Sequence, residues 1–94
     1  MRTINRVILH CSATKEGQDI DAATIRTWHI APPRSWSDIG YHFVVKIDGT
    51  IESGRPINRP GAHTKGHNRD SIGICYVGGL DYSGHPKNTM TSEQ

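Results

Sequence analysis

Three apolar runs stand out in a largely polar chain, and each predicts a β-strand. Residues 6–10 contain Val-Ile-Leu and end in His10, which predicts a short buried strand with a histidine at its exit. Residues 41–46 alternate in polarity and are rich in phenylalanine and valine. Residues 71–77 read SIGICYV, an unbroken β-rich run typical of a central strand. The pattern therefore predicts a sheet built on three strands.

One amphipathic helix is predicted between the first two strands. It begins near Asp21, with Asp19 or Asp21 as its N-cap, and extends to about residue 30. Two prolines, Pro32 and Pro33, end it. Its apolar face consists of Ala22, Ile25, Trp28 and His29. Loops are predicted for the remaining polar stretches, which are 12–19, 34–40, 54–68 and 80–88.

Two short patterns add detail at the turn and at the end of the chain. Asp48 and Gly49 predict a hairpin turn that leads into a return strand over residues 50–52. Thr91 and Gln94 have the spacing of a capping box, which marks the start of a helix. A helix start with no helix after it leads us to expect a C-terminally truncated chain, with a frayed polar tail as the alternative.

Length and charge restrict the classes of function. The 94 residues suffice for one domain, residues 1–94, with a small core. The net charge is +2 and the basic residues are scattered, so no basic stripe supports nucleic-acid binding, although Trp28 and Trp36 could stack on bases. No apolar run is long enough to span a membrane. The first ten residues lack the apolar segment of a signal peptide, so we expect synthesis in the cytoplasm.

Histidines and cysteines are the residues with the most chemical potential. Six histidines are many for this length and point weakly to metal or proton chemistry. Cys11 and Cys75 are expected to be thiols, because cytosolic proteins rarely hold disulfides. Cys75 lies within an apolar run and is expected in the core. Cys11 follows His10 directly, and neighbouring strand residues point to opposite faces, so we do not expect both on one metal.

Five stretches then occur in one order and spacing: VILHCSAT, WH, SDIGYHFVVKIDGTIESGRP, GAHTKGHNRDSIGICYVGG and MTSEQ. Together they resemble the zinc-dependent N-acetylmuramoyl-L-alanine amidases, which include amidase-type phage lysozymes and animal peptidoglycan recognition proteins. The resemblance covers nearly all of residues 7–94. It implies an α/β fold in which a mixed central β-sheet is flanked by helices and a groove holds one Zn²⁺. Compared with the family, the C-terminal helix and the last strand are missing.

The resemblance also implies a metal ligand. In the family, the histidine that ends the first strand binds zinc, and it matches His10 here. The other two ligands, a histidine and a cysteine or aspartate, follow a further long helix that this sequence does not contain, which strengthens the expectation of truncation. The chain could therefore be an inactive fragment. An alternative is that His10 completes a site with His63 or with a histidine of a neighbouring chain.

The remaining site residues are also assigned from the resemblance. Tyr41 matches a tyrosine that points at the metal-bound water and the scissile carbonyl, where a phenol can stabilise the oxyanion. His63 and His29 match residues of the groove, and Lys65 is a candidate for binding acidic groups of the substrate. Each has a structural alternative: a strand-end tyrosine, an exposed loop residue, a helix-end histidine favoured by the helix dipole, or a solvated lysine. His42 is expected to point away from Tyr41 and to be structural.

The function implied is hydrolysis of peptidoglycan at the amide between N-acetylmuramic acid and L-alanine, by a water that zinc activates. Such an enzyme acts on the bacterial cell wall once it is released. The alternative is a module that binds muropeptide without cleaving it. A sheet that lacks its last strand and a covering helix should also expose an apolar face, so we expect self-association.

Overall fold

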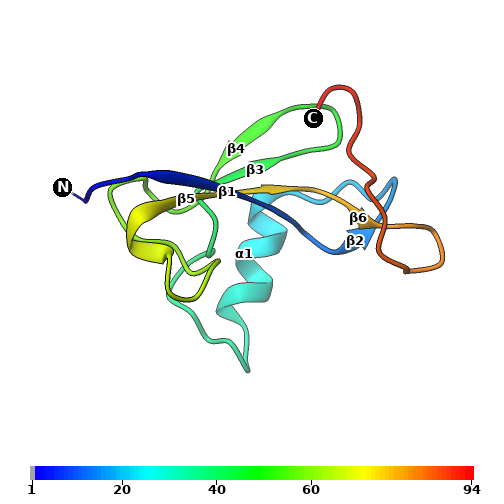
Figure 1. Cartoon of the computed structure of the whole chain (residues 1–94). Helices are drawn as coiled ribbons and strands as arrows, with labels where there is room; N and C mark the ends of the chain where they lie inside the picture. The colour runs from blue at the N-terminus through cyan, green and yellow to red at the C-terminus, as the bar shows by residue number, and fades with distance from the viewer. Residues whose placement is uncertain (1) are drawn as a thin grey trace.

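The computed structural model describes residues 2–94 and contains a four-stranded sheet, a two-stranded sheet and one α-helix (Figure 1). In chain order the elements are β1 (Arg6–Cys11), β2 (Thr14–Lys15), α1 (Ala22–Ile30), β3 (Phe43–Val45), β4 (Ile51–Ser53), the 3₁₀-helix η1 (Asn68–Asp70), β5 (Ser71–Tyr76) and β6 (Gly79–Leu80). The mixed α/β architecture expected from the sequence is confirmed.

The larger sheet has the strand order β1-β5-β3-β4. β5 lies inside the sheet and pairs in parallel with both β1 and β3, while β4 pairs with β3 as an antiparallel hairpin. The register places His10 beside Cys75, so the two side chains share one face of the sheet. The prediction of residues 71–77 as a central strand is confirmed, with β5 ending at Tyr76.

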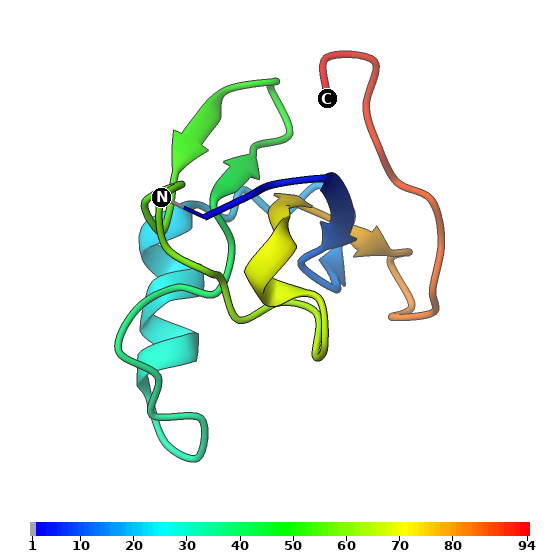
Figure 2. The ribbon, with the colours of Figure 1, turned by 60° about the vertical axis from the view of Figure 1, so that its left-hand side comes forward.

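The hydrophobic core lies between the larger sheet and α1, which covers one face (Figures 1 and 2). It consists of Ala22, Ile25, Ile39, Val44, Cys75 and Val77. Cys75 is fully buried and is a free thiol, as the sequence predicted. In β1, Val7 and Leu9 are more than half exposed. The expectation of a buried strand at residues 6–10 is therefore wrong for one face, because β1 lies at the edge of the larger sheet and α1 covers only the opposite face. Self-association through these exposed residues stays a prediction.

The helix begins at the predicted place because its cap is satisfied. Asp21 is the N-cap, and its Oδ1 accepts hydrogen bonds from the Thr24 backbone N–H at 2.9 Å and from the Thr24 hydroxyl at 2.6 Å. These bonds lower the pKa of the Asp21 carboxyl. The helix ends at Ile30, before the two prolines. Within residues 2–94, no helix is both long and apolar enough to cross a lipid bilayer.

The C-terminal residues form the predicted capping box. The Gln94 backbone N–H donates to Thr91 Oγ1 at 3.3 Å, and the Thr91 N–H donates to Gln94 Oε1 at 3.0 Å. The Gln94 side-chain amide donates to the carbonyl oxygens of Val45 and Val77, both at 3.1 Å. These bonds hold the last residues beside the β3–β4 hairpin (Figure 1), so the alternative of a frayed tail is wrong.

Two local predictions differ from the structure. The second strand was expected over residues 41–46 but spans only Phe43–Val45. Tyr41 and His42 precede it, and their carbonyl oxygens accept hydrogen bonds from the backbone N–H groups of Arg55 and Gly54. The predicted loops 12–19 and 80–88 also include strand residues, since β2 pairs with β6 through two residues each. Two-residue strands are too short to show a periodic pattern.

Candidate functional site

Four aromatic side chains from separate parts of the chain meet at the end of β1. We call them the His–Tyr cluster: His10 from β1, His29 from α1, Tyr41 just before β3, and His63 from the loop before η1. The ring centroids of His10 and Tyr41 are 5.5 Å apart, those of His10 and His63 are 5.0 Å apart, and those of His29 and Tyr41 are 5.5 Å apart. The structure therefore brings four of the five predicted site residues together.

His10 and His63 are in direct contact. His10 Nε2 lies 3.0 Å from His63 Nδ1, and Thr64 Oγ1 lies 3.1 Å from each of these two nitrogens. Three polar atoms thus form a triangle at the strand end. His10 and His63 are both only partly buried. Together with Thr64 they form a small polar group that a ligand could contact.

The backbone around His63 fixes the position of its ring. Asn68 Oδ1 accepts hydrogen bonds from the backbone N–H groups of His63 and Thr64 at 3.0 and 2.9 Å. A Cβ atom at Gly73, in β5, would lie 2.5 Å from His63 Cδ2, so only a glycine lets the ring pack this closely on the strand. His63 is therefore held by its own loop and by a glycine of the central strand.

His29 and His42 each have one ring nitrogen occupied by a backbone N–H. Gly40 N–H donates to His29 Nδ1 at 2.9 Å, and Gly73 N–H donates to His42 Nδ1 at 3.0 Å. His42 Nε2 lies 2.8 Å from the Arg59 carbonyl oxygen, to which it donates. His42 is 1% exposed and has a structural role, as predicted. Because His29 Nδ1 accepts the bond from Gly40, the proton of the neutral ring lies on Nε2, and this second nitrogen remains available to a ligand.

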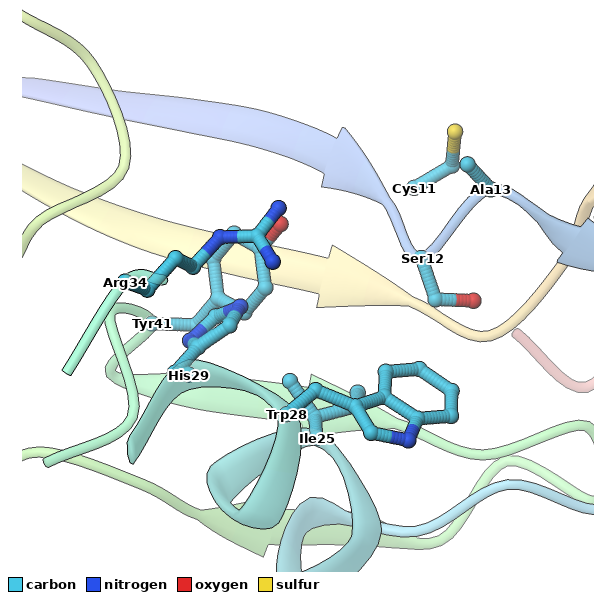
Figure 3. A pocket seen from close by; sticks show the side chains of 8 residues that line it. All are labelled: Cys11, Ser12, Ala13, Ile25, Trp28, His29, Arg34 and Tyr41. Carbon is cyan, nitrogen blue, oxygen red and sulfur yellow. The ribbon is translucent and has the colours of Figure 1, made fainter. Parts of the chain in front are cut away.

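A first pocket of about 210 Å³ opens beside the His–Tyr cluster (Figure 3). It is lined by Cys11, Ser12, Ala13, Ile25, Trp28, His29, Arg34 and Tyr41. Figure 3 shows the side chains of His29, Arg34 and Tyr41 gathered at one end, with Trp28 at the other and the Cys11 sulfur turned away from them. The guanidinium carbon of Arg34 lies 5.8 Å from the centre of the Trp36 ring. This pocket combines aromatic surface with one cation.

A second pocket of about 350 Å³ adjoins His63 on its loop side. It is lined by Trp36, Ala62, His63, Thr64, Lys65, Gly66 and Asn68. Lys65, the fifth predicted site residue, lies here rather than in the His–Tyr cluster, and its side chain is exposed. An exposed ammonium at the rim of a pocket can bind carboxylates of a ligand.

Burial shifts the pKa of the residues in and beside the cluster. Burial, with a smaller effect of the Cys75 and Cys11 thiols, raises the pKa of the Tyr41 hydroxyl well above its usual value, so it stays a hydrogen-bond donor. Burial also raises the pKa of the Cys75 thiol to about 12. It lowers the pKa of His63 to about 4, helped by His10 and His42. Near neutral pH the site therefore consists of a neutral phenol and neutral imidazoles.

This pattern predicts that stability falls in mild acid. Burial lowers the native pKa of His10, His29, His42 and His63, whereas in the unfolded chain each titrates near 6.5. The unfolded state therefore binds more protons below about pH 6.5, and stability is lost as the pH falls toward the native values. We expect a melting temperature at about pH 4.5 that is lower than at about pH 7.5 by about 5 °C or more.

Circular dichroism melts across this pH range would test the expectation. The replacement His63→Asn should make the fall in melting temperature shallower, because it removes one of the histidines that favour the native state only when neutral. The replacement of the exposed His85 by Asn is the matched control and should leave the fall unchanged. A melting temperature that is constant between the two pH values would contradict the prediction.

The donor set does not form a complete zinc site. A catalytic Zn²⁺ takes three protein ligands and one water. Among residues 2–94, no group of three histidine, cysteine, aspartate or glutamate side chains is placed to hold a metal ion. His10 and His63 are in contact, as the alternative in which His63 completes the zinc site of His10 requires. Within residues 2–94, however, no third side chain of these types joins them. The described residues thus fit at most part of a zinc site.

Several residues at the site were not found from the sequence. Arg34 was placed in a loop without a role, Trp36 was considered only for stacking on bases, and Thr64 and Ser71 were not singled out. The only signal for Thr64 was its position after His63. In contrast, the side chain of Arg55 donates to the carbonyl oxygens of Ile39 and Pro60 at 3.0 Å. It holds two loops together.

Comparison with known proteins agrees with this geometry. The chain is 49% identical over 88 residues to the endolysin of Escherichia phage T7, a match that covers 94% of this chain and 57% of that protein. The endolysin amidase LysCS of Clostridium intestinale superposes with a TM-score of 0.79 at 31% identity, covering 99% of this chain and 55% of that one. Peptidoglycan-recognition protein LE in complex with tracheal cytotoxin superposes with a TM-score of 0.71 at 34% identity, covering 85% and 49%.

The chain thus spans about half the length of these relatives. The family model for N-acetylmuramoyl-L-alanine amidase matches residues 1–94. The match covers every one of the ordered motifs. The chain belongs to the N-acetylmuramoyl-L-alanine amidase family.

Proposed function

We propose that this chain forms the substrate site of a peptidoglycan hydrolase that acts on the bacterial cell wall. The bond cleaved is the amide between N-acetylmuramic acid and L-alanine. The observation that carries the proposal is the contact of His10 with Tyr41, which lines the first pocket, and with His63, which lines the second, in a chain of the amidase family. Its similarity to a phage endolysin and to an endolysin amidase supports this activity.

The roles of the residues follow from their protonation. Tyr41 keeps its proton because burial raises its pKa, so its hydroxyl can donate to the oxygen of the scissile amide as charge develops there. His29 carries its proton on Nε2 and can donate to a carbonyl in the first pocket. Lys65 can pair with a carboxylate of the stem peptide at the second pocket. A muropeptide offers both carbonyls and carboxylates.

The proposal also includes a zinc ion, with His10 as its first ligand. The described residues do not supply a third ligand, so this proposal needs ligands from outside residues 2–94. The substrate-binding roles of Tyr41, His29 and Lys65 do not depend on the metal.

The proposal is tested by titrating the chain with a muropeptide that contains the intact lactyl–alanine amide. We expect NMR shift changes at Tyr41, His29, His63 and Lys65, with or without added Zn²⁺. A site that spans the scissile bond should bind the intact muropeptide more tightly than free N-acetylmuramic acid or the free stem peptide. Equal affinity for the free stem peptide would instead support the alternative of a muropeptide-binding module, and peptidoglycan-recognition protein LE shows that a related chain binds such a ligand.

The replacement Tyr41→Phe adds a specific check. It removes one hydrogen bond, worth about 1 kcal/mol, so we expect an affinity about fivefold lower. Tyr82→Phe is the matched control, because Tyr82 is 75% exposed in a loop and lines neither pocket. Unchanged muropeptide affinity in both variants would remove Tyr41 from the proposed site.

A further inference from the structure

Ser71 is a buried polar residue to which the proposed function assigns no role. It is the first residue of β5 and its side chain has no exposed surface. Its Oγ lies 2.6 Å from the carbonyl oxygen of His67 and 3.3 Å from Nε2 of His63. Because a carbonyl oxygen can only accept, the Ser71 hydroxyl donates its single proton to His67. Its oxygen is then available only as an acceptor.

This acceptor decides which nitrogen of His63 carries the proton. A neutral imidazole has one N–H and one bare nitrogen. With the proton on Nε2, His63 donates to Ser71 Oγ. With the proton on Nδ1, the lone pairs of Nε2 and Oγ would face each other across 3.3 Å. Ser71 therefore favours the Nε2–H tautomer, and Nδ1 of His63 is left bare.

The bare Nδ1 in turn constrains His10. Nδ1 of His63 lies 3.0 Å from His10 Nε2 and 3.1 Å from Thr64 Oγ1. If His10 Nε2 were also bare, it would face that lone pair, and the single Thr64 proton could satisfy only one of the two nitrogens. With the proton on His10 Nε2, two arrangements are possible. In the first, His10 Nε2–H donates directly to His63 Nδ1. In the second, it donates to Thr64 Oγ1, and the Thr64 hydroxyl donates to His63 Nδ1. Both arrangements leave Nδ1 of His10 bare.

We propose that Ser71 is a positioning residue that acts through His63 and sets the tautomer of His10. Its hydroxyl directs the proton of His63 to Nε2, and the bare Nδ1 of His63 then holds the proton of His10 on Nε2. The nitrogen of His10 that can accept a ligand is consequently Nδ1. The use of this nitrogen rests on the proposed function, whereas the two tautomers rest on the contacts alone.

The ring tautomers can be read directly by long-range ¹H–¹⁵N correlation NMR of the wild-type chain near neutral pH. We expect His10 and His63 each to show a protonated Nε2 and a bare Nδ1. His29 and His42 serve as internal references, because the Gly40 and Gly73 N–H groups donate to their Nδ1 atoms. A His63 that carries its proton on Nδ1 would overturn the proposal without any variant.

The replacement Ser71→Ala then tests the cause. It removes the acceptor, so we expect a several-fold larger Nδ1–H population at His63 and a change in the ¹⁵N shifts of the His10 ring, with His29 unchanged. Ser53→Ala, at an exposed serine of β4, is the matched control and should change neither ring. Unchanged tautomers in folded Ser71→Ala would refute the role of Ser71.

A second variant and an independent titration complete the test. If Ser71→Ala does not fold, Ser71→Cys keeps the volume of the side chain but offers only a weak acceptor, and the same shift in the tautomers is expected. The muropeptide titration is independent of these spectra. The expected tautomers without muropeptide binding would mean that the proposed function fails alone, and the reverse result would mean that only the role of Ser71 fails.

Discussion

The replacement Ile39→Ala is expected to destabilise this chain by about 2–5 kcal/mol. Ile39 has no exposed surface and packs in the core between α1 and the sheet. Its truncation removes three buried carbon atoms and leaves a cavity that the surroundings fill only partly. Domains are stable by only about 5–15 kcal/mol, and a small domain with a thin core lies toward the lower end. A large share of the molecules should therefore unfold at moderate temperature.

Urea unfolding followed by circular dichroism measures this effect. Ile51→Ala is the matched control, since Ile51 is 67% exposed in β4 and its truncation should change stability by less than about 0.5 kcal/mol. Similar losses for the two variants would mean that the core does not lie where the structure places it. The buried thiol of Cys75 offers a second readout, because it should react with thiol reagents faster in Ile39→Ala.

The replacement Gly73→Ala is expected to disturb both stability and the His–Tyr cluster. The three atoms nearest to the new Cβ all belong to the His63 ring, at 2.5 to 2.8 Å. Either the ring moves away from His10 or β5 shifts, and overpacking of this kind costs about 1–3 kcal/mol. We also expect weaker muropeptide binding, because His63 leaves its place beside His10.

A double-mutant cycle identifies the clash as the cause. In Gly73→Ala/His63→Ala the ring is absent, so the methyl group meets no obstacle there and the loss should be smaller than the sum of the two single losses by about 1 kcal/mol or more. Additive losses would show that Gly73 matters for the conformation of the strand and not for the packing of His63. The ¹H–¹⁵N ring spectra would show independently whether His63 still faces His10.

The core elements could be predicted because each has a strong local signal. The apolar runs at 6–10 and 71–77 became β1 and β5, and Asp21 caps α1 as its side chain and position indicated. The hairpin at Asp48 and Gly49 is also present, as β3 and β4. β2 and β6 were missed because each is two residues long and is held by its partner rather than by its own sequence.

The residues of the candidate site could be named from the sequence, but their contacts could not. His10, Tyr41, His29 and His63 were named through the resemblance of the whole motif set. The contact between His10 and His63 joins segments far apart in the chain, and no local pattern encodes such a pair. Ser71 and Gly73 lie within a run that reads as an ordinary apolar strand, so their effect on His63 became visible only when β5 and the loop before η1 were seen together.

The parallel pairing of β1 with β5 has a consequence for how the chain folds. Arg6 pairs with Ser71 at one end of the ladder and Cys11 with Tyr76 at the other, so β1 leaves the ribosome long before its partner strand β5 is made. Closing such a distant contact is slow compared with forming a helix or hairpin. During synthesis the Val-Ile-Leu segment of β1 therefore stays unpaired until β5 has emerged. Newly made chains should depend on chaperones, or aggregate, at this stage more than at any later one.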